Sequence, residues 1–220
     1  MDAALQAPTS VARASALPLA VVKLGGSIVR SGQLAGWLEV LAGVERPIVI
    51  VPGGGALADE VRQCQRQLGF GDSTAHRMAL LAMDQLAWAI AGVRSGFAVG
   101  VAPEELREIL QRGLAAVWAP SALIAGRTDL EATWRLTSDS LALWLAGKLG
   151  ASDCCVVKSA TVPRGSLSAD ALMGDGVVDE AFSAMLAETA IRTTIFGQGD
   201  EAVLGSYLAG RSPAHASVVA

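Results

Sequence analysis

Short apolar runs alternate with helical patterns along the first part of this chain. Residues 19–24 and 47–51 are mostly apolar, and each run leads into consecutive glycines, which predicts two buried strands that end in glycine loops. Between them, apolar residues recur with the period of a helix, at Leu34, Trp37, Leu38 and Leu41. Gly43 then offers a helix end. A strand, a helix and a second strand in this order predict a βαβ unit.

The same alternation continues toward the C-terminus. Helical spacing predicts a helix that ends at Gly69, a longer helix from about Thr74, and a third from Pro103 to Gly113. The inward positions predicted for the longer helix are Met78, Leu81, Ala82, Leu86, Ala89 and Ile90. The remaining predictions are a broken strand region over 117–124, a polar connection over 125–136, a helix from Thr137 that ends at Gly150, a strand over 154–158, an irregular excursion over 159–176, a helix over 179–189, a strand over 191–196, a helix over 200–208 and an edge strand over 216–219. Strands that alternate with helices throughout predict a mainly parallel central sheet covered on both faces, which is a three-layer α/β/α sandwich.

The composition is that of a folded protein. Apolar residues make up 52% of the 220 residues and charged residues only 17%, which excludes intrinsic disorder. The longest apolar runs are shorter than the roughly 20 residues of a membrane span, or are interrupted by polar residues, so no membrane partner is expected. The net charge is −4 and no block of like charge occurs, so no nucleic-acid partner is expected.

The cysteines and the N-terminus bear on the cellular location. Three cysteines cannot all pair with one another, and Cys154 and Cys155 are neighbours in a predicted strand, where their side chains point to opposite faces. Residues 1–17 lack the charged and apolar regions of a secretory signal. We therefore expect a cytoplasmic protein with a flexible N-terminus over 1–17.

Lysines close two of the predicted strands. Only three residues are lysines, and two of them, Lys23 and Lys158, lie at or near the carboxyl end of a predicted buried strand. A buried ammonium group needs a partner, and in a phosphate site it can neutralise a phosphoryl group during transfer. The two glycine loops fall at the same edge of the sheet, where backbone N–H groups can bind phosphate. Each loop taken alone is equally well explained as a strand-to-helix turn.

Asp139 and His76 each have two interpretations. Asp139 stands in the first turn of a predicted helix, where capping explains it without a catalytic role. His76 is explained as a surface or capping residue, or as a contact to an acceptor phosphate. The sequence contains no P-loop, no Rossmann glycine fingerprint, no nucleophile elbow and no cluster of metal ligands. P-loop and Rossmann interpretations therefore lack their key residues.

Four motifs in order resemble the amino acid kinase family, which includes acetylglutamate, aspartate, uridylate and isopentenyl phosphate kinases. They are V-K-L-G-G-S at 22–27, V-P-G-G-G at 51–55, L-T-S-D-S-L-A at 136–142 and V-V-K at 156–158. The match in motif order and strand placement runs from about residue 21 to residue 196. The resemblance implies an ATP-dependent kinase that uses magnesium and forms a homo-oligomer. It also implies one domain over 18–220, with an acceptor-binding N-terminal part and a nucleotide-binding C-terminal part.

The resemblance places the transferring phosphate and the nucleotide at the first glycine loop and at the start of the helix from Thr137. The residues that it implies there are Gly25, Gly26, Ser27, Thr137 and Ser138. Lys23, Asp139 and Lys158 would be the catalytic residues. Asp139 would organise the lysines or the magnesium region, and Lys158 would lie by the nucleotide phosphates. The sequence departs from uridylate kinases after Lys158, where Ser159 replaces the first residue of the usual Asp-Gly pair.

Further stretches, A-L-A-D-E-V-R at 56–62, A-H-R-M-A at 75–79 and V-V-D-E-A-F at 177–182, look most like the aminomethylfuran-phosphate kinases of methanofuran biosynthesis. The resemblance implies that ATP converts 5-(aminomethyl)-3-furanmethanol phosphate to its diphosphate. The implied acceptor site consists of Gly53, Gly54, Gly55, Asp59, His76 and Trp134. Asp59 or Asp84 would pair with the ammonium group, and Trp134 would lie against the furan ring. The alternatives are a uridylate kinase, an isopentenyl phosphate kinase, or a non-catalytic protein of this fold that binds a nucleotide or another anion.

Overall fold

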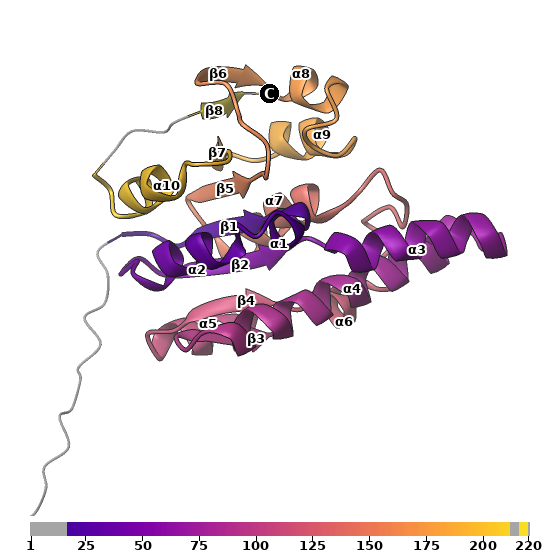
Figure 1. Cartoon of the computed structure of the whole chain (residues 1–220), viewed down its shortest axis with the longest axis horizontal. Helices are drawn as coiled ribbons and strands as arrows, with labels where there is room; N and C mark the ends of the chain where they lie inside the picture. The colour runs from indigo at the N-terminus through magenta and orange to yellow at the C-terminus, as the bar shows by residue number, and fades with distance from the viewer. Residues whose placement is uncertain (1–16, 212–215, 220) are drawn as a thin grey trace, which may run out of the picture.

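A computed structural model describes residues 17–211 and 216–219, which are organised around an eight-stranded sheet (Figure 1). The strands lie in the order β3-β4-β2-β1-β5-β7-β8-β6. Their bounds are β1 Ala20–Leu24, β2 Ile48–Pro52, β3 Phe97–Gly100, β4 Ala115–Trp118, β5 Asp153–Val157, β6 Gly165–Ser168, β7 Arg192–Phe196 and β8 Ala216–Val219. Neighbouring strands pair in parallel, except for the antiparallel pair β7 and β8. The segment predicted to be flexible lies outside the described residues, apart from Leu17.

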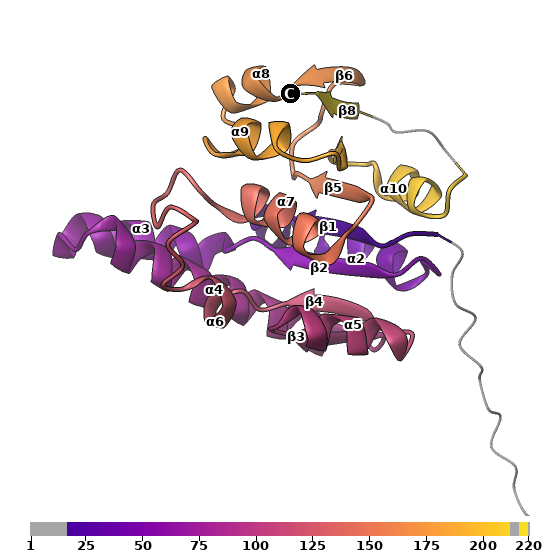
Figure 2. The same cartoon turned by 180° about the vertical axis from the view of Figure 1, so that it is seen from behind.

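Helices cover both faces of the sheet, which confirms the predicted three-layer α/β/α sandwich (Figure 1 and Figure 2). One face carries α1 Ser27–Arg30, α2 Leu34–Ala42, α10 Glu201–Leu208 and the C-terminal half of α4 Asp72–Val93. The other face carries α5 Pro103–Gln111, α7 Ser138–Leu149, α8 Ala169–Gly174 and α9 Phe182–Ala187. The remaining helices are α3 Gly55–Leu68, which packs along α4, and α6 Ser121–Ile124, which follows β4. In both views α3 and α4 extend beyond the strands at the end where β1 and β2 point.

Two apolar clusters form the core, one on each side of the sheet. Alternate residues of β5 enter different clusters: Cys154 lies on the side of α7 and Cys155 on the side of α2, as predicted. β1, β2 and β5 are buried along their whole length, because helices cover both of their faces. The predicted helix ends at Gly69 and Gly150 are confirmed, since both glycines adopt the left-handed conformation. Within residues 17–211 and 216–219, no helix is both long enough and apolar enough to cross a bilayer.

The pairing of β8 corrects the prediction of an edge strand over 216–219. β8 lies between β7 and β6, and the edges of the described sheet are β3 and β6. β6 belongs to the stretch predicted as an irregular excursion, which also contains α8. Its sequence, G-S-L-S, has one apolar residue and is largely exposed, so no apolar run marks it as a strand. The predicted broken strand region over 117–124 is correct only at residues 117 and 118, which end β4, and α6 replaces the predicted strand at residues 121–124.

Two of the predicted inward residues of α4 are wrong. Leu81 is 49% exposed, and Ala89 is exposed as well. The inner face of α4 changes along the helix, because Met83 enters the cluster on the α7 side whereas Ile90 enters the cluster on the α2 side. A single helical stripe cannot describe a helix that contacts both sides of the core.

Candidate active site

The two glycine loops meet at the carboxyl edge of the sheet. The parallel register pairs Leu24 at the end of β1 with Pro52 at the end of β2, and the N–H of Gly53 donates to the carbonyl of Leu24 at 2.8 Å. A Cβ atom on Gly26 would lie 2.2 Å from the backbone nitrogen of Gly55, and one on Gly53 would lie 2.5 Å from that of Gly26. Both distances are far below van der Waals contact, so this close approach of two backbones requires glycine.

A carboxylate between two lysines lies next to these loops. Lys23 Nζ of β1 is 2.7 Å from Asp139 Oδ1, and Lys158 Nζ, directly after β5, is 2.8 Å from Asp139 Oδ2. Lys23 is 4% exposed and Asp139 is 5% exposed. The structure thus brings together three residues that are far apart in sequence, and all three are the predicted catalytic residues.

Burial and charge act against each other in this cluster. Burial raises the pKa of Asp139, but the charges of Lys23 and Lys158 outweigh it and lower that pKa to about 2. Burial and the like charge of Lys23 lower the pKa of Lys158 to about 8, although Asp139 opposes the shift. At neutral pH Asp139 is therefore a carboxylate and Lys158 is an ammonium group.

If Lys158 contacts a transferring phosphoryl group, as the resemblance implies, turnover should fall as the pH rises through about 8, because the Lys158 amine then loses its charge. The effect of Lys158 on the free energy of unfolding has the opposite pH dependence. Between about pH 8 and 10.5 the unfolded chain, in which the lysine pKa is near 10.5, binds more protons than the folded chain. This group therefore stabilises the fold further as the pH rises from 8 toward 10.5. The measurement is a pH profile of kcat at saturating substrates, with melting temperatures at each pH. A kcat that stays constant to pH 9.5 would contradict the role of the Lys158 ammonium.

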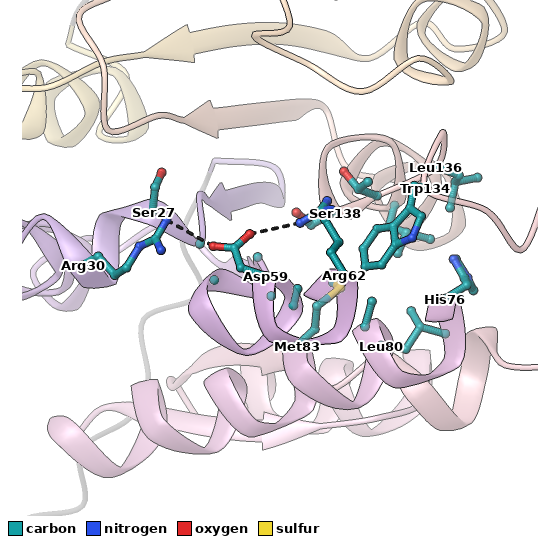
Figure 3. Close-up of a pocket in the computed structure, with 18 residues that line it drawn as sticks. Ser27, Arg30, Asp59, Arg62, His76, Leu80, Met83, Trp134, Leu136 and Ser138 are labelled. Carbon is teal, nitrogen blue, oxygen red and sulfur yellow. Dashed lines mark hydrogen bonds and ion pairs between the residues drawn. The ribbon is translucent and has the colours of Figure 1, made fainter. Parts of the chain in front are cut away.

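A pocket with a volume of about 220 Å³ opens beside the glycine loops (Figure 3). Its walls come from the two loops, from α1, α3 and α4, and from the segment 134–141. The predicted site residues that line it are Gly26, Ser27, Gly53, Gly54, Gly55, Asp59, His76, Trp134, Thr137 and Ser138. Gly25 is buried behind the first loop, and its N–H donates to the Val157 carbonyl. Residues predicted for the nucleotide and for the acceptor thus share one pocket.

Two arginines that the sequence did not single out flank Asp59 in this pocket. Asp59 Oδ2 is 3.1 Å from Arg30 and Asp59 Oδ1 is 3.1 Å from Arg62 (Figure 3). The guanidinium of Arg62 lies 4.0 Å from the ring centroid of Trp134, and the indole N–H donates to Gln65 at 2.7 Å. Two guanidinium groups face one carboxylate, so this wall carries net positive charge.

His76 and Asp84 differ in their relation to the pocket. His76 is 8% exposed and lines the wall, which corrects its interpretation as a surface or capping residue. Burial lowers its pKa, so the imidazole is neutral at pH 7. Asp84 instead accepts hydrogen bonds from the backbone N–H and the hydroxyl of Ser121. It caps α6 and does not line the pocket, which leaves Asp59 as the carboxylate of the pocket wall.

The start of α7 corrects the interpretation of Asp139 as a helix cap, and its catalytic role stays a prediction. The N-cap residue is Thr137, and the Asp139 carboxylate faces lysines instead of the helix N–H groups. Asp179 takes the capping position, because it accepts hydrogen bonds from Thr137 and Ser140. Burial and the nearby charge of Asp139 raise the pKa of Asp179. Its 42-residue separation from Thr137 hides this contact from any local pattern.

A serine pair stands where the sequence departs from uridylate kinases. The hydroxyls of Ser27 and Ser159 are 2.8 Å apart, so the residue after Lys158 is hydrogen-bonded to the first glycine loop. Among the side chains of residues 17–211 and 216–219, no three from His, Cys, Asp or Glu gather closely enough to hold a metal ion.

Comparisons with known proteins agree with this arrangement. Residues 18–161 match the amino acid kinase family. A (5-(aminomethyl)furan-3-yl)methyl phosphate kinase of Methanocaldococcus jannaschii is 28% identical over 177 residues, which cover 76% of this chain and 82% of that protein. The fold is similar to the crystal structure of a uridylate kinase from Archaeoglobus fulgidus, with a TM-score of 0.69, 18% identity, and coverage of 92% of this chain and 100% of that one. A UMP kinase from Bacillus anthracis gives a TM-score of 0.69 at 13% identity, over 91% of this chain and 95% of the other.

The family match covers more than half of the chain, and it includes both glycine loops and all three residues of the lysine and carboxylate cluster. The similarity to the two solved structures extends the same fold over the C-terminal part of the sheet. The chain therefore belongs to the amino acid kinase family and is a phosphotransferase.

Proposed function

We propose that this protein transfers the γ-phosphoryl group of ATP to a small phosphate monoester and so forms a diphosphate. The observation that carries the proposal is the cluster of Lys23, Asp139 and Lys158 beside two touching glycine loops. Two ammonium groups at this place can neutralise the charge that builds up on a transferring phosphoryl group. Asp139 keeps both lysines in place without cancelling their combined charge.

The loops supply the phosphate contacts in this proposal. Gly26 and Gly54 line the pocket with their backbone N–H groups, and the 14-residue helix α3 starts at Gly55 with the positive end of its dipole. A phosphate monoester has a second pKa near 6, so its oxygens are already ionised at pH 7. The acceptor oxygen attacks the γ-phosphorus, the bond to the bridging oxygen breaks, and ADP leaves. No side chain has to remove a proton.

The pocket wall supports an acceptor that carries both a phosphate and an amine. Arg30 and Arg62 favour an anion, whereas Asp59 and the face of Trp134 favour a cation. The volume of about 220 Å³ lies below the roughly 300–1,000 Å³ of pockets for drug-sized ligands, which suits a small molecule. With the relative from M. jannaschii, these features support 5-(aminomethyl)-3-furanmethanol phosphate as the acceptor.

Magnesium would have to arrive with the nucleotide. Asp139 is the carboxylate nearest the lysines, and both of its oxygens face ammonium groups. The side chains of the described residues therefore do not form a site that could bind Mg²⁺ through protein ligands alone. Mg²⁺ is commonly held by substrate phosphates with few protein ligands, and we propose that arrangement here.

With ATP and 5-(aminomethyl)-3-furanmethanol phosphate, the protein should release ADP and form the diphosphate, and it should do so faster than with UMP or isopentenyl phosphate. An acceptor without an amine makes no ion pair with Asp59, whose side chain is 46% exposed, and the loss of such a pair costs about 0.2–1 kcal/mol. ADP release in a coupled assay, with ³¹P NMR of the product, measures this preference. Asp59→Asn should then raise the KM for the aminated acceptor more than the KM for an analogue without the amine.

Three results would change the proposal. Faster turnover of UMP or isopentenyl phosphate would reassign the acceptor and leave the kinase activity standing. Equal effects of Asp59→Asn on both acceptors would assign Asp59 to holding Arg30 and Arg62 only. Binding of ATP without ADP release for any phosphorylated acceptor in the panel would favour a non-catalytic binding protein.

A further inference from the structure

Asp179 connects two distant parts of the chain. It lies in the turn before α9, and its carboxylate accepts four hydrogen bonds from the start of α7. Oδ2 accepts the N–H of Thr137 at 2.9 Å, the hydroxyl of Thr137 at 2.8 Å and the N–H of Ser140 at 3.1 Å, and Oδ1 accepts the hydroxyl of Ser140. These four donors fill the hydrogen-bonding capacity of the carboxylate, so all of it serves to hold the first turn of α7.

This carboxylate replaces the ordinary cap of α7. In a local N-cap, the Thr137 oxygen would accept the N–H of Ser140, but Thr137 makes no such bond. Its hydroxyl donates to Asp179 instead, and Asp179 takes the N–H of Ser140. An anion at this position also complements the helix dipole. Because the cap comes from outside the helix, Asp139 is free to face Lys23 and Lys158.

The residues after Asp179 add two more links to the segment before α7. The N–H of Ala181 donates to the carbonyl of Arg135 at 3.0 Å, and the guanidinium of Arg135 is 3.0 Å from Glu180. Phe182, the first residue of α9, is fully buried. The turn that presents Asp179 is therefore fixed by the core on one side and by α7 on the other.

We propose that Asp179 is a positioning residue of the phosphoryl-transfer site. It holds the first turn of α7, so that Asp139 stays between the two lysines and Ser138 stays in the pocket wall. Asp179 itself neither lines the pocket nor makes an ion pair with a lysine, so its contacts reach the site through α7, and its charge in addition raises the pKa of Lys158. The inference rests on the proposed function, because it assumes that the lysine cluster carries out the transfer.

The test compares Asp179→Ala, Asp179→Asn and a control, Asp170→Asn. Asp170 of α8 accepts a hydrogen bond from Ser183 of α9 at 2.5 Å, so the control removes a carboxylate in the same layer without touching α7. With ATP and 5-(aminomethyl)-3-furanmethanol phosphate, Asp179→Ala should lower kcat at least about tenfold and change the KM for ATP less, because misplaced charges weaken transfer more than binding. Asp179→Asn should keep kcat within about threefold of wild type, since its amide oxygen can accept the backbone N–H groups of Thr137 and Ser140 and its amide N–H can donate to the Ser140 hydroxyl.

Lysine acetylation gives a readout that needs no acceptor. The chain has three lysines, and the exposed Lys148 serves as an internal reference for Lys23 and Lys158. Brief treatment with acetic anhydride, followed by mass spectrometry, measures each lysine separately. In Asp179→Ala the ratio of Lys158 to Lys148 acetylation should rise several-fold, because a displaced Asp139 no longer holds the Lys158 amine. The ratio should stay at the wild-type value in Asp170→Asn.

Each outcome decides the proposal. A wild-type kcat in Asp179→Ala, or a loss of kcat with an unchanged acetylation ratio, would overturn it. If Asp179→Ala melts below the assay temperature, Ser140→Ala, which removes one of the four donors, should change kcat and the ratio in the same direction, and no change in either would overturn the proposal. If wild-type protein releases no ADP with this acceptor, the proposed function fails, and the acetylation ratio alone decides whether Asp179 positions Asp139.

Discussion

Lys23→Met is expected to lower kcat by about 100-fold or more while the dissociation constant for ATP changes much less. The ammonium of Lys23 is buried next to the glycine loops, where it acts most strongly on charge that develops during transfer. Loss of one such contact costs about 3 kcal/mol of transition-state stabilisation. Methionine keeps the length and volume of the buried stem, so the substitution leaves no large cavity. Steady-state kinetics and calorimetric titration with ATP separate the two effects.

Lys148→Met is the matched control, because Lys148 is an exposed lysine in the last turn of α7. It should turn over at the wild-type rate. A Lys23→Met variant that also turns over normally would remove Lys23 from the mechanism, and a large loss of ATP affinity with unchanged kcat would make it a binding residue only.

Asp139→Asn should abolish most turnover and also lower the melting temperature. Without the carboxylate, the ammonium groups of Lys23 and Lys158 face each other in a buried site. Removal of one partner of a buried ion pair typically costs about 3–5 kcal/mol, which corresponds to roughly 10 °C in a protein of this size. A capping role predicts a different result, because asparagine caps a helix as well as aspartate does and the melting temperature would then stay constant.

The pH dependence of this destabilisation provides a further check. The pKa of Lys158 should be lower in Asp139→Asn than in the wild type, because the favourable charge of Asp139 is gone. The wild-type fold therefore binds more protons than the variant fold below about pH 8, and the difference in melting temperature should narrow as the pH rises to that value. A difference that is the same at pH 6 and pH 9 would contradict the repulsion between the lysines as its cause.

The strands and helix ends that the sequence predicts correctly are those whose signal comes from residues close together in the sequence. β1, β2 and β5 are apolar runs because helices cover both of their faces, and α3 and α7 end at glycines because the left-handed conformation favours that residue. β3 and β6 lie at the two edges of the sheet and have four residues each. β6 has one apolar residue and carries no comparable signal, whereas β3, F-A-V-G, is apolar but shorter than β1, β2 and β5. No strand is predicted over either of them.

The residues of the candidate site also differ in how far the sequence predicts their position. The glycine loops and the lysines lie next to strand ends, so their shared position follows from the parallel order of the strands. The two interpretations of Asp139 cannot be separated from its own helix, because the cap of that helix comes from Asp179. Arg30 and Arg62 stand on helix surfaces, where charged residues are usually solvated, and only the folded chain brings both to Asp59.

The contact between the two glycine loops means that the spacing of the phosphates and the recognition of the acceptor depend on different residues. Backbone atoms of Gly26, Gly53 and Gly55 set the spacing of the loops, so the distance between donor and acceptor phosphates would not depend on any side chain that recognises the rest of the acceptor. Asp59, Arg62 and Trp134 lie outside that contact, on α3 and on the segment before α7. Variation at these side chains could therefore give new acceptor preferences in descendants of this protein, natural or designed, without any change in the path along which phosphorus moves.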